Sequence, residues 1–446
     1  MHLRYLPHTD ADVQKMLDAI GVSSFDEIIA GIPTSLRSAP ITEPKAVAES
    51  VLLQTYRARA RKGEAGPTFV GAGLYQHYVP VAVDSLLQRS EFFTAYTPYQ
   101  PEASQGTLQA IFEYQTTVAE LMGLDVANAS MYDFASAAAE AVLMAVRLGR
   151  KRRRILVAGS VHPDTGEVIR TYVAGVEVDV EDVPLHEGRL DIDALRRALG
   201  DDVAGVVVQS PNCLGLIEEV EQIAGATHGA GAKLIVVVNE PTSLGLLKPP
   251  GACGADIAVG EGTGIGIPPS FGGPGLGLFA TRQAHVRQMP GRLVGEATDA
   301  DGRIGYVLTL ATREQHIRRE RATSNICTNH GLCALAFTIH SALLGPHGLR
   351  DLGRQCAQRA RYLVGRLADR GVSRRYEAPY YNEIIVELGD RVDRAIELGI
   401  DRGFSVGFDL GRWREEWSGG LMIAASELHN RHQLDTLVDI LAKASR

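Results

Sequence analysis

Cysteine is scarce and irregularly placed in this chain. Its 446 residues include only five cysteines, an odd number, and no two of them form a CxxC pair. The 13 histidines form no HExxH or HxH pattern. A disulfide framework and a structural metal site are therefore not expected, and the free thiols fit the reducing environment of the cytoplasm.

Long apolar runs and an excess of positive charge are also missing. No uninterrupted apolar run approaches the roughly 18 residues of a membrane span, and the first ten residues lack the apolar core of a signal peptide. The net charge is −8, whereas nucleic-acid binders need a positive surface. We therefore expect a cytoplasmic protein that binds neither a membrane nor nucleic acid.

The composition is that of an ordinary globular protein, with 45% hydrophobic and 22% charged residues. The length suits two or three domains. The pattern predicts a helical N-terminal segment over residues 1–62, a large α/β domain over 63–344 and a smaller α+β domain over 345–446. Apolar residues at helical spacing predict helices over 10–20, 24–30 and 46–61.

Short runs of Val, Ile, Leu and Ala alternate with helical stretches in the middle region. Such runs are typical of strands buried on both faces, as in a mostly parallel sheet covered by helices. The predicted strands span residues 154–159, 176–180, 205–209, 233–239, 256–260 and 276–281, with helices over 108–122 and 137–148. The last region predicts helices over 349–367, 392–402 and 433–444, and strands over 382–388 and 421–425.

Features at the ends of these strands fit the binding of pyridoxal phosphate (PLP). The glycine-rich stretch 259–277 lets backbone amides approach an anion, and a helix starting near Ser136 offers its N-terminus to a phosphate. Glu240 follows a buried strand, where PLP enzymes place the acid that pairs with the pyridine nitrogen. The simpler interpretations are a tight connection between strands, an N-cap at Ser136 and a cap at Glu240.

The lysine that would bind PLP is missing. The chain has seven lysines, and none lies between Cys253 and Pro290, where the Schiff-base lysine should follow the next strand. Counting back from residues 272–274 places Thr263 at that position, and threonine cannot form an imine. Lys248 leaves open a self-sufficient PLP enzyme. A nicotinamide dehydrogenase is disfavoured, since its glycine fingerprint is absent.

Several motifs are spread along the chain. They are RYLPHT (4–9), YTPYQPEASQG (96–106), ANASMYD (127–133), LLKPPG (246–251), ADIA (255–258), GGP (272–274), PGRLVG (290–295) and TREQHIRRERATSNICTN (312–329). The last of these is long and highly specific. Together these motifs resemble those of glycine decarboxylase, the P-protein of the glycine cleavage system, and more closely its α subunit. The resemblance runs almost end to end.

The resemblance implies an assembly and a reaction. In that family, α and β subunits form a dimer that pairs again as α2β2. The β subunit holds PLP through its own lysine, whereas the α subunit has the same fold, no lysine and a vestigial pocket. The implied reaction is the decarboxylation of glycine with transfer of an aminomethyl group to the lipoyl group of H-protein. This chain would then close the active site of the β subunit by positioning groups and excluding water.

Three groups of residues are the candidates for these tasks. The partner's active site would be completed by Tyr96, Thr97, Pro98, Tyr99, Gln100, Asn128 and Ser130, of which Asn128 and Ser130 are also candidates to face the vestigial pocket. The vestigial pocket would be lined by Ser136, His162, Glu240 and Thr263. Docking of the partner or an acidic carrier would fall to Arg313, His316, Arg318, Arg319, Arg321, Thr323, Ser324 and Asn325. For the loop at 96–100, the alternative is ordinary loop packing, and for His162 it is a histidine that only packs in the core. For the docking group, the alternative is a solvent-exposed helix with ion pairs at helical spacing.

Some positions depart from the family pattern. Residues 239–241 read Asn-Glu-Pro where Ala-Asp-Pro is expected, residues 134–136 replace a Gly-Ala/Thr turn, and Gly-Thr-Gly at 262–264 replaces Gly-Gln-Ser. These changes cluster on the expected pocket. They leave open a divergent paralogue that acts on another small amino acid or carrier. A scaffold subunit with no part in catalysis is a further alternative.

Overall fold

The chain forms two units, Met1–Glu64 and Ala65–Arg446, in a computed structural model that describes residues 7–38, 45–62 and 66–446. In the first unit, α1 (Asp10–Ile20), α2 (Phe25–Ile28) and α3 (Glu49–Lys62) lie where apolar spacing predicts helices. Thr9 and Asp12 form a capping box at the start of α1, and Gly21, in the left-handed conformation, ends it.

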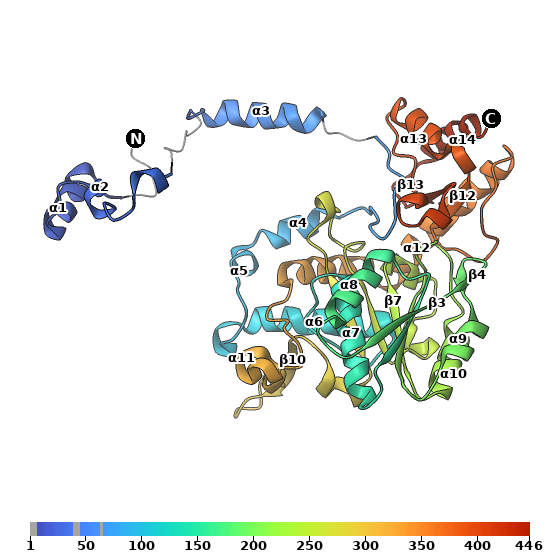
Figure 1. Cartoon of the computed structure of the whole chain (residues 1–446), viewed down its shortest axis with the longest axis horizontal. Helices are drawn as coiled ribbons and strands as arrows, with labels where there is room; N and C mark the ends of the chain where they lie inside the picture. The colour runs from blue at the N-terminus through green and yellow to red at the C-terminus, as the bar shows by residue number, and fades with distance from the viewer. Residues whose placement is uncertain (1–6, 39–44, 63–65) are drawn as a thin grey trace. The chain divides into compact units, whose positions relative to one another are not determined.

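The second unit is built on a seven-stranded sheet with the order β1-β9-β8-β7-β6-β2-β3 (Figure 1). Strands β3, β2, β6, β7 and β8 run parallel, while β9 and β1 pair antiparallel with their neighbours. Every residue of β6, β8 and β9 is buried, which explains their continuous apolar runs. The predicted mostly parallel α/β sheet is confirmed. The bounds are β1 (Val126–Ala127), β2 (Arg154–Ala158), β3 (Asp179–Val183), β6 (Val203–Gln209), β7 (Lys233–Val238), β8 (Ile257–Glu261) and β9 (Gly277–Thr281).

Helices cover both faces of this sheet, with α7 and α8 on one side and α9 and α10 on the other (Figure 1). Helix α7 packs against β6, β7, β8 and β9. Its buried face is mostly alanine, and such small side chains let the helix lie close to the strands. The helices are α4 (Val81–Leu87), α5 (Ser90–Phe93), α6 (Gln105–Met122), α7 (Phe134–Gly149), α8 (Pro163–Val173), α9 (Ile192–Ala198), α10 (Val220–Gly229) and α11 (Gln315–Arg318).

A hairpin that the sequence pattern misses follows the main sheet. Strands β10 (Leu293–Thr298) and β11 (Ile304–Thr309) pair antiparallel, and the short β4 (Leu185–His186) and β5 (Arg189–Leu190) form a second small ladder. The turn between β10 and β11 is closed by Asp299, whose carboxylate accepts two backbone N–H groups. Gly302 adopts a positive φ there. The Asp-Gly pair at 301–302 between two strand-like runs is the signal that predicts such a turn.

Helix α12 (Gly331–Ala368) is longer than the sequence pattern predicts. The backbone of α12 is non-helical at Gly345, and Pro346 follows. This kink lies where the sequence predicts the boundary between the large domain and the C-terminal domain. Among the described helices, α12 has the length and composition that a membrane span requires, which core helices of soluble proteins also have. Whether residues 345–446 form a separate domain stays a prediction.

The C-terminal region has a three-stranded antiparallel sheet, in the order β12-β14-β13. The elements are β12 (Glu383–Glu387), α13 (Val392–Ile400), β13 (Phe408–Asp409), β14 (Gly420–Ala424) and α14 (Arg431–Ala444). Phe69 ties the start of the second unit to this sheet. Its N–H donates to Ser405 and its carbonyl accepts from Ala424, while its fully buried ring stacks on His429 at a centroid distance of 4.0 Å.

Replacing Phe69 with alanine should destabilise the chain strongly. The change leaves a cavity in the C-terminal core, and losses of this kind cost about 3–5 kcal/mol. The matched control is Phe93→Ala, because the Phe93 side chain is 67% exposed and its loss should cost less than about 0.5 kcal/mol. Urea unfolding of both variants measures the difference. Equal unfolding midpoints for the two variants would contradict this account of the core.

Candidate functional site

The C-terminal end of β7 carries a buried carboxylate, Glu240. Its Oε2 atom lies 3.0 Å from Nε2 of His77, and its Oε1 atom accepts the backbone N–H of Thr242 at 3.1 Å. The other ring nitrogen of His77, Nδ1, lies 2.8 Å from Oε2 of Glu427. One imidazole therefore joins carboxylates from two distant parts of the chain, the end of β7 and the segment after β14.

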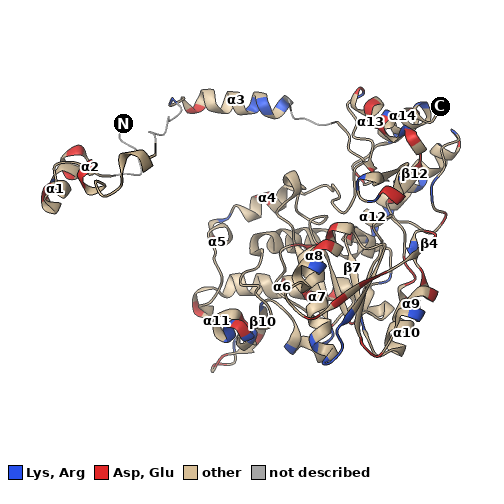
Figure 2. Ribbon diagram, viewed as in Figure 1, with Lys and Arg blue, Asp and Glu red and all other residues tan. Residues whose placement is uncertain are grey.

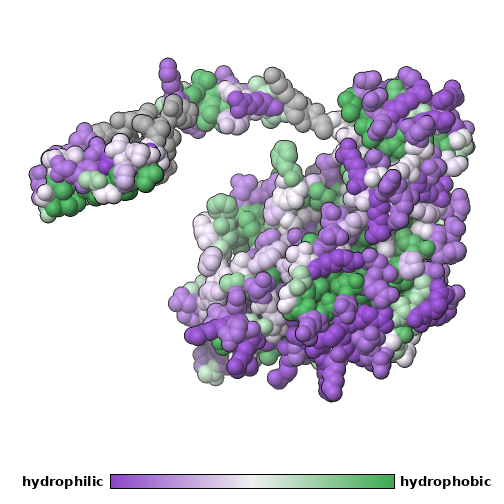
Figure 3. Space-filling model, in the orientation of Figure 1, coloured by the Kyte–Doolittle hydropathy of each residue, from purple (hydrophilic) through white to green (hydrophobic). Residues whose placement is uncertain are grey.

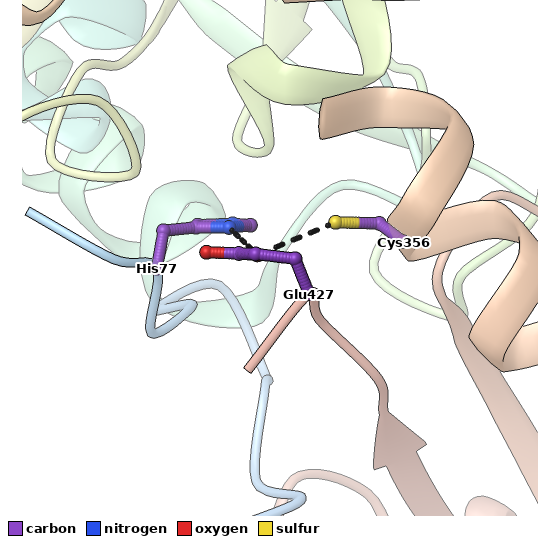
Figure 4. A group of neighbouring side chains, drawn as sticks. All are labelled: His77, Cys356 and Glu427. Carbon is purple, nitrogen blue, oxygen red and sulfur yellow. Dashed lines mark hydrogen bonds and ion pairs between the residues drawn. The ribbon is translucent and has the colours of Figure 1, made fainter. Parts of the chain in front are cut away.

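His77 is charged in this arrangement. Burial by itself lowers the pKa of His77, but the charge of Glu240 and hydrogen bonds to Cys356, Glu240 and Glu427 outweigh it and raise the pKa well above its ordinary value. The Cys356 thiol lies 3.6 Å from Glu427 (Figure 4). Donor atoms of these three side chains fall within 4.8 Å of one another, as a metal site would require. Both nitrogens of His77 already face carboxylates, however, so ion pairing accounts for the cluster.

A third carboxylate, Glu383 of β12, lies in the same buried region. It accepts the phenol of Tyr75 at 2.9 Å and the N–H of Ala72 at 2.8 Å. Burial raises the pKa of Glu383 to about 7, and the charge of Glu240 acts in the same direction. The segment that carries Ala72, Tyr75 and His77 is thus held by three glutamates.

The N-terminus of α7 is occupied by Glu261, from the end of β8. Its Oε2 atom accepts the N–H of Phe134 at 3.3 Å, and its Oε1 atom accepts the N–H groups of Thr263 at 3.1 Å and Leu276 at 2.8 Å. Burial raises the pKa of Glu261 to about 7, against the effect of these three hydrogen bonds. The carboxylate lies where a helix end would otherwise present its N–H groups to a phosphate.

Ser136 is neither the start nor the N-cap of this helix, which corrects the interpretation from sequence. Helix α7 begins at Phe134, and its N-cap is Asp133. The Asp133 carboxylate accepts the N–H of Ser136 at 2.7 Å, and the Ser136 hydroxyl accepts the N–H of Asp133 at 3.2 Å. An aspartate directly before the first helical residue is a common N-cap, and Asp133 precedes Phe134 in this way. The hydroxyl of Ser136 is used inside this capping box.

His162 and Thr263 are buried beside these carboxylates. The His162 ring lies edge-on to Trp413 at 4.7 Å and to Phe134 at 5.7 Å, and its Nε2 atom is 3.1 Å from the carbonyl of Ala72. Burial lowers the pKa of His162. The four residues predicted to line one pocket, Ser136, His162, Glu240 and Thr263, are therefore brought into one buried region.

This region does not fit PLP as a cofactor of the chain itself. No lysine lies between Cys253 and Pro290, the stretch that contains β8 and the loop after it, and Lys248 is exposed and pairs with Glu221 on α10. The acid at the end of β7, Glu240, already pairs with His77, and the end of α7 already binds Glu261. The structure thus gives no support to a self-sufficient PLP enzyme that uses Lys248.

A second set of predicted residues converges on a buried arginine, Arg292. Its Nε atom lies 3.3 Å from Glu314 in an ion pair that is almost entirely buried. Its other nitrogens donate to the hydroxyl of Thr97 at 3.2 Å and to the phenol of Tyr99 at 2.8 Å. Arg292 therefore fixes the loop that carries these two hydroxyls from its buried side. Tyr96 and Tyr99 nevertheless remain 83% and 50% exposed.

Other motif residues hold the backbone around this loop. The Asn128 amide donates to the carbonyl of Pro290 at 3.0 Å, and the Ser130 hydroxyl accepts the N–H of His330 at 3.0 Å. Both side chains are almost completely buried and hold the backbone around this loop, and their predicted part in a partner's active site stays a prediction. Within the loop, Pro98 is buried and Gln100 is exposed.

The predicted docking block divides into buried and exposed parts. The guanidinium of Arg313 turns inward and donates to the carbonyls of Met289 and Gly291, and the Ser324 hydroxyl donates to Glu140 of α7 at 2.7 Å. Acidic and basic residues are mixed along the chain around α11 (Figure 2), so its charged residues are not all positive. The exposed members are His316, Arg318, Arg319, Arg321 and Asn325, and Thr323 is half-buried.

An apolar cavity of about 250 Å³ opens beside the Tyr96–Gln100 loop. Exposed hydrophobic side chains gather near α5 (Figure 3), and patches of this kind mark interaction sites in soluble proteins. Side chains that line the cavity include Phe92, Phe93, Tyr96, Ile111, Leu332 and Leu335.

These observations define a class of protein. The sheet order, the helices on both faces, the acid after β7 and the missing lysine after β8 are those of a fold type I PLP-dependent enzyme that has no cofactor attachment of its own. A sphingosine-1-phosphate lyase from Burkholderia pseudomallei shares the fold, with a TM-score of 0.65 at 15% identity over 92% of this chain and 93% of that one.

The chain belongs to the glycine cleavage system P-protein family, whose model matches residues 3–441. It is 48% identical to a probable glycine dehydrogenase (decarboxylating) subunit 1 from Sorangium cellulosum, over 99% of both chains. It is 46% identical to the protein of the same name from Geobacillus kaustophilus, over 98% of both. A solved structure of glycine decarboxylase (P-protein), in inhibitor-bound form, superposes with a TM-score of 0.89 at 42% identity and covers 99% of this chain.

These similarities confirm the predicted family, the fold type I architecture and the interpretation as an α-type subunit of glycine decarboxylase. The relatives are named subunit 1, so they are parts of an enzyme with more than one kind of subunit. The predicted roles of individual residues stay predictions.

Sequence reasoning missed four residues that organise both sites. His77 and Glu261 are single ionisable residues in polar or glycine-rich segments, and no local pattern marks them. Arg292 and Glu314 both lie inside motifs that were recognised, but their pairing joins positions 22 residues apart. Both motifs contain ionisable residues of opposite charge, and this is the signal that could identify Arg292 and Glu314 as a candidate ion pair.

The Arg292–Glu314 pair should show strong coupling in a double-mutant cycle. Arg292→Met leaves the Glu314 carboxylate buried without its partner, which costs about 3–5 kcal/mol. Replacing both residues, as Arg292→Met with Glu314→Leu, should recover a large part of that loss. Urea unfolding of the two single variants and the double variant measures the coupling. Purely additive losses would show that the pair is not the support of this loop.

The His77 ion pairs should make the unfolding free energy of the chain decrease as the pH rises above neutral. Because the folded state raises the pKa of His77, the stabilisation is complete below the ordinary value of about 6.5 and is lost as pH rises through the higher folded pKa. We expect the wild-type chain to exceed His77→Gln in unfolding free energy by a margin that shrinks as pH rises. Chemical unfolding across this range measures the margin. A margin that grows with pH would mean that His77 is neutral in the folded state.

Proposed function

We propose that this chain completes the active site of a PLP-carrying β subunit in an α2β2 glycine decarboxylase. In such an assembly, PLP on the partner supplies the electron sink for decarboxylation of glycine, and the lipoyl group of H-protein receives the aminomethyl product. This chain contributes surfaces and polar groups and does not contribute the cofactor.

The observation that carries the proposal is the loop held by Arg292. The buried Arg292–Glu314 pair holds Thr97 and the phenol of Tyr99, and the exposed Tyr96 lies next to Thr97 in the same loop. A rigid support of this kind orients exposed polar groups without loss of side-chain entropy at the moment of binding. Tyr96 and Tyr99 can therefore bound a substrate channel formed with the partner, exclude water from it and donate hydrogen bonds into it.

The partner's contact surface is proposed to include the apolar side chains next to this loop. Phe93 and Tyr96 are largely exposed, and Leu332 of α12 adds further exposed apolar surface beside them. An obligate partner typically buries more than about 2,000 Å², with a hydrophobic centre. Because this surface adjoins the Arg292-held loop, docking there would bring the loop to the partner's active site.

The exposed arginines of the docking block are proposed to meet H-protein or an acidic loop of the β subunit. His316, Arg318 and Arg321 lie on this surface, among Glu320 and other acids. Exposed charges act mainly on the rate of association and on specificity. Their contribution should therefore weaken as salt concentration rises.

The loop tyrosines give the direct test in a reconstituted complex with the PLP-carrying partner. Tyr96→Ala and Tyr99→Phe should each lower glycine-dependent exchange of CO2 by about 10- to 100-fold, because small misplacements at a reacting centre have effects of this size. The control is Tyr362→Phe, which loses the phenol hydrogen bonds with Asp435 and Arg431, away from the loop. Size-exclusion chromatography must show intact assembly for each variant.

Normal turnover by Tyr96→Ala and Tyr99→Phe in an intact assembly would contradict the proposal. That outcome would favour the scaffold alternative, in which the chain stabilises its partner only. A complex that turns over another small amino acid faster than glycine would instead favour a divergent paralogue.

A further inference from the structure

We infer that this chain fills its own cofactor pocket with side chains that stand in for the two charged ends of PLP: His77 for the pyridinium, and Glu261 for the phosphate. The inference concerns this chain alone. It goes beyond the missing lysine, because it explains why the pocket folds without any cofactor.

The first stand-in meets the acid at the end of β7. An acid at this position pairs with a protonated ring nitrogen in PLP enzymes, and here Glu240 pairs with a ring nitrogen of His77 at 3.0 Å. Both side chains are only 2% exposed. A buried carboxylate needs a counter-charge to remain ionised, and His77 supplies it from within the chain.

The second stand-in meets the end of α7. The first N–H groups of a helix have no partner inside the helix and bind anions. One of them, from Phe134, donates to Glu261, which also binds the N–H groups of Thr263 and Leu276. The carboxylate thus accepts three backbone N–H groups in the cradle that a phosphate would need.

The two stand-ins belong to one pocket, because a closed series of contacts links them. Phe134 donates to Glu261 and packs against His162. Gly73 lies close to the His162 ring, and Gly264 lies close to the His77 ring. A side-chain Cβ added at these glycines would come within 3.0 Å and 3.4 Å of the two rings, respectively. Gly264 follows Thr263, whose N–H returns to Glu261.

Close packing at the phosphate end leaves no room for a second anion. A Cβ on Gly275 would lie 2.9 Å from Asp133 and 3.3 Å from Oε2 of Glu261. The Asp133 carboxylate also caps the first turn of α7, so two acids already face this helix end. A phosphate that entered would meet like charge as well as steric overlap.

The inference predicts chemical rescue by inorganic phosphate. In Glu261→Ala of the full-length chain, the N–H groups at the end of α7 lose their anion and a space opens. Replacing chloride by saturating phosphate at equal ionic strength should raise the Tm of Glu261→Ala by at least about 2 °C more than it raises the wild-type Tm, which shifts only by the general stabilising effect of phosphate. Thermal unfolding in the two salts is the measurement.

Glu218→Ala is the matched control. Glu218 is also buried and also accepts a backbone N–H, from Leu190, together with the side chains of Ser160 and Asn212. Those donors lie on β5 and in two loops, and not at a helix end. Phosphate should raise the Tm of Glu218→Ala no more than it raises the wild-type Tm. Rescue of Glu261→Ala alone supports the inference, whereas equal shifts in the wild type, or no shift in Glu261→Ala, overturn it.

A measurement on the unaltered chain applies if Glu261→Ala does not fold. Pyridoxamine 5′-phosphate has both charged ends of the cofactor but no aldehyde to react with surface lysines. Equilibrium dialysis should show no stoichiometric binding to the wild-type chain. Stoichiometric binding would overturn the inference, because a pocket already filled by His77 and Glu261 has no place for it.

Discussion

The bridge from His77 to Glu240 and Glu427 is the interaction on which the architecture of the second unit depends. It joins the segment before α4, the end of β7 and the segment after β14 through one buried ring. Each carboxylate would be costly to bury alone. The charged imidazole offsets that cost for both, and the C-terminal region and the main sheet are thereby fixed to the same point.

The same bridge occupies the acid that PLP enzymes of this fold pair with their cofactor. The acid after β7 is kept, but its partner is a side chain instead of a cofactor, and the end of α7 is closed by Glu261 in the same manner. The chemical capacity of the chain therefore lies elsewhere. The Arg292–Glu314 pair fixes a loop with two exposed tyrosines next to an apolar surface, which suits a subunit that acts on its partner's substrate.

The parts of the fold that depend on local pattern could be predicted from the sequence. The buried strands β6, β7 and β8 are continuous apolar runs, and α1 has a capping residue and a terminal glycine at its ends. The missing lysine and the long motif at 312–329 gave the family. Predictions failed at the ends of elements: α12 already begins at Gly331 although the predicted helix begins at residue 349, β3 begins later than Val176, and the N-cap of α7 is Asp133 and not Ser136. The roles of His77, Glu261 and Arg292 arise only when distant segments meet, so no local pattern reveals them.

The central claim is that this chain acts in a PLP enzyme without holding PLP itself. The most direct measurement is to incubate the purified chain with PLP, reduce it with borohydride and determine its intact mass. The account predicts no stoichiometric pyridoxyl adduct, since Thr263 occupies the place of the lysine and the seven lysines lie at other positions. A stoichiometric adduct on one lysine, such as Lys248, would contradict the account and identify an independent PLP enzyme.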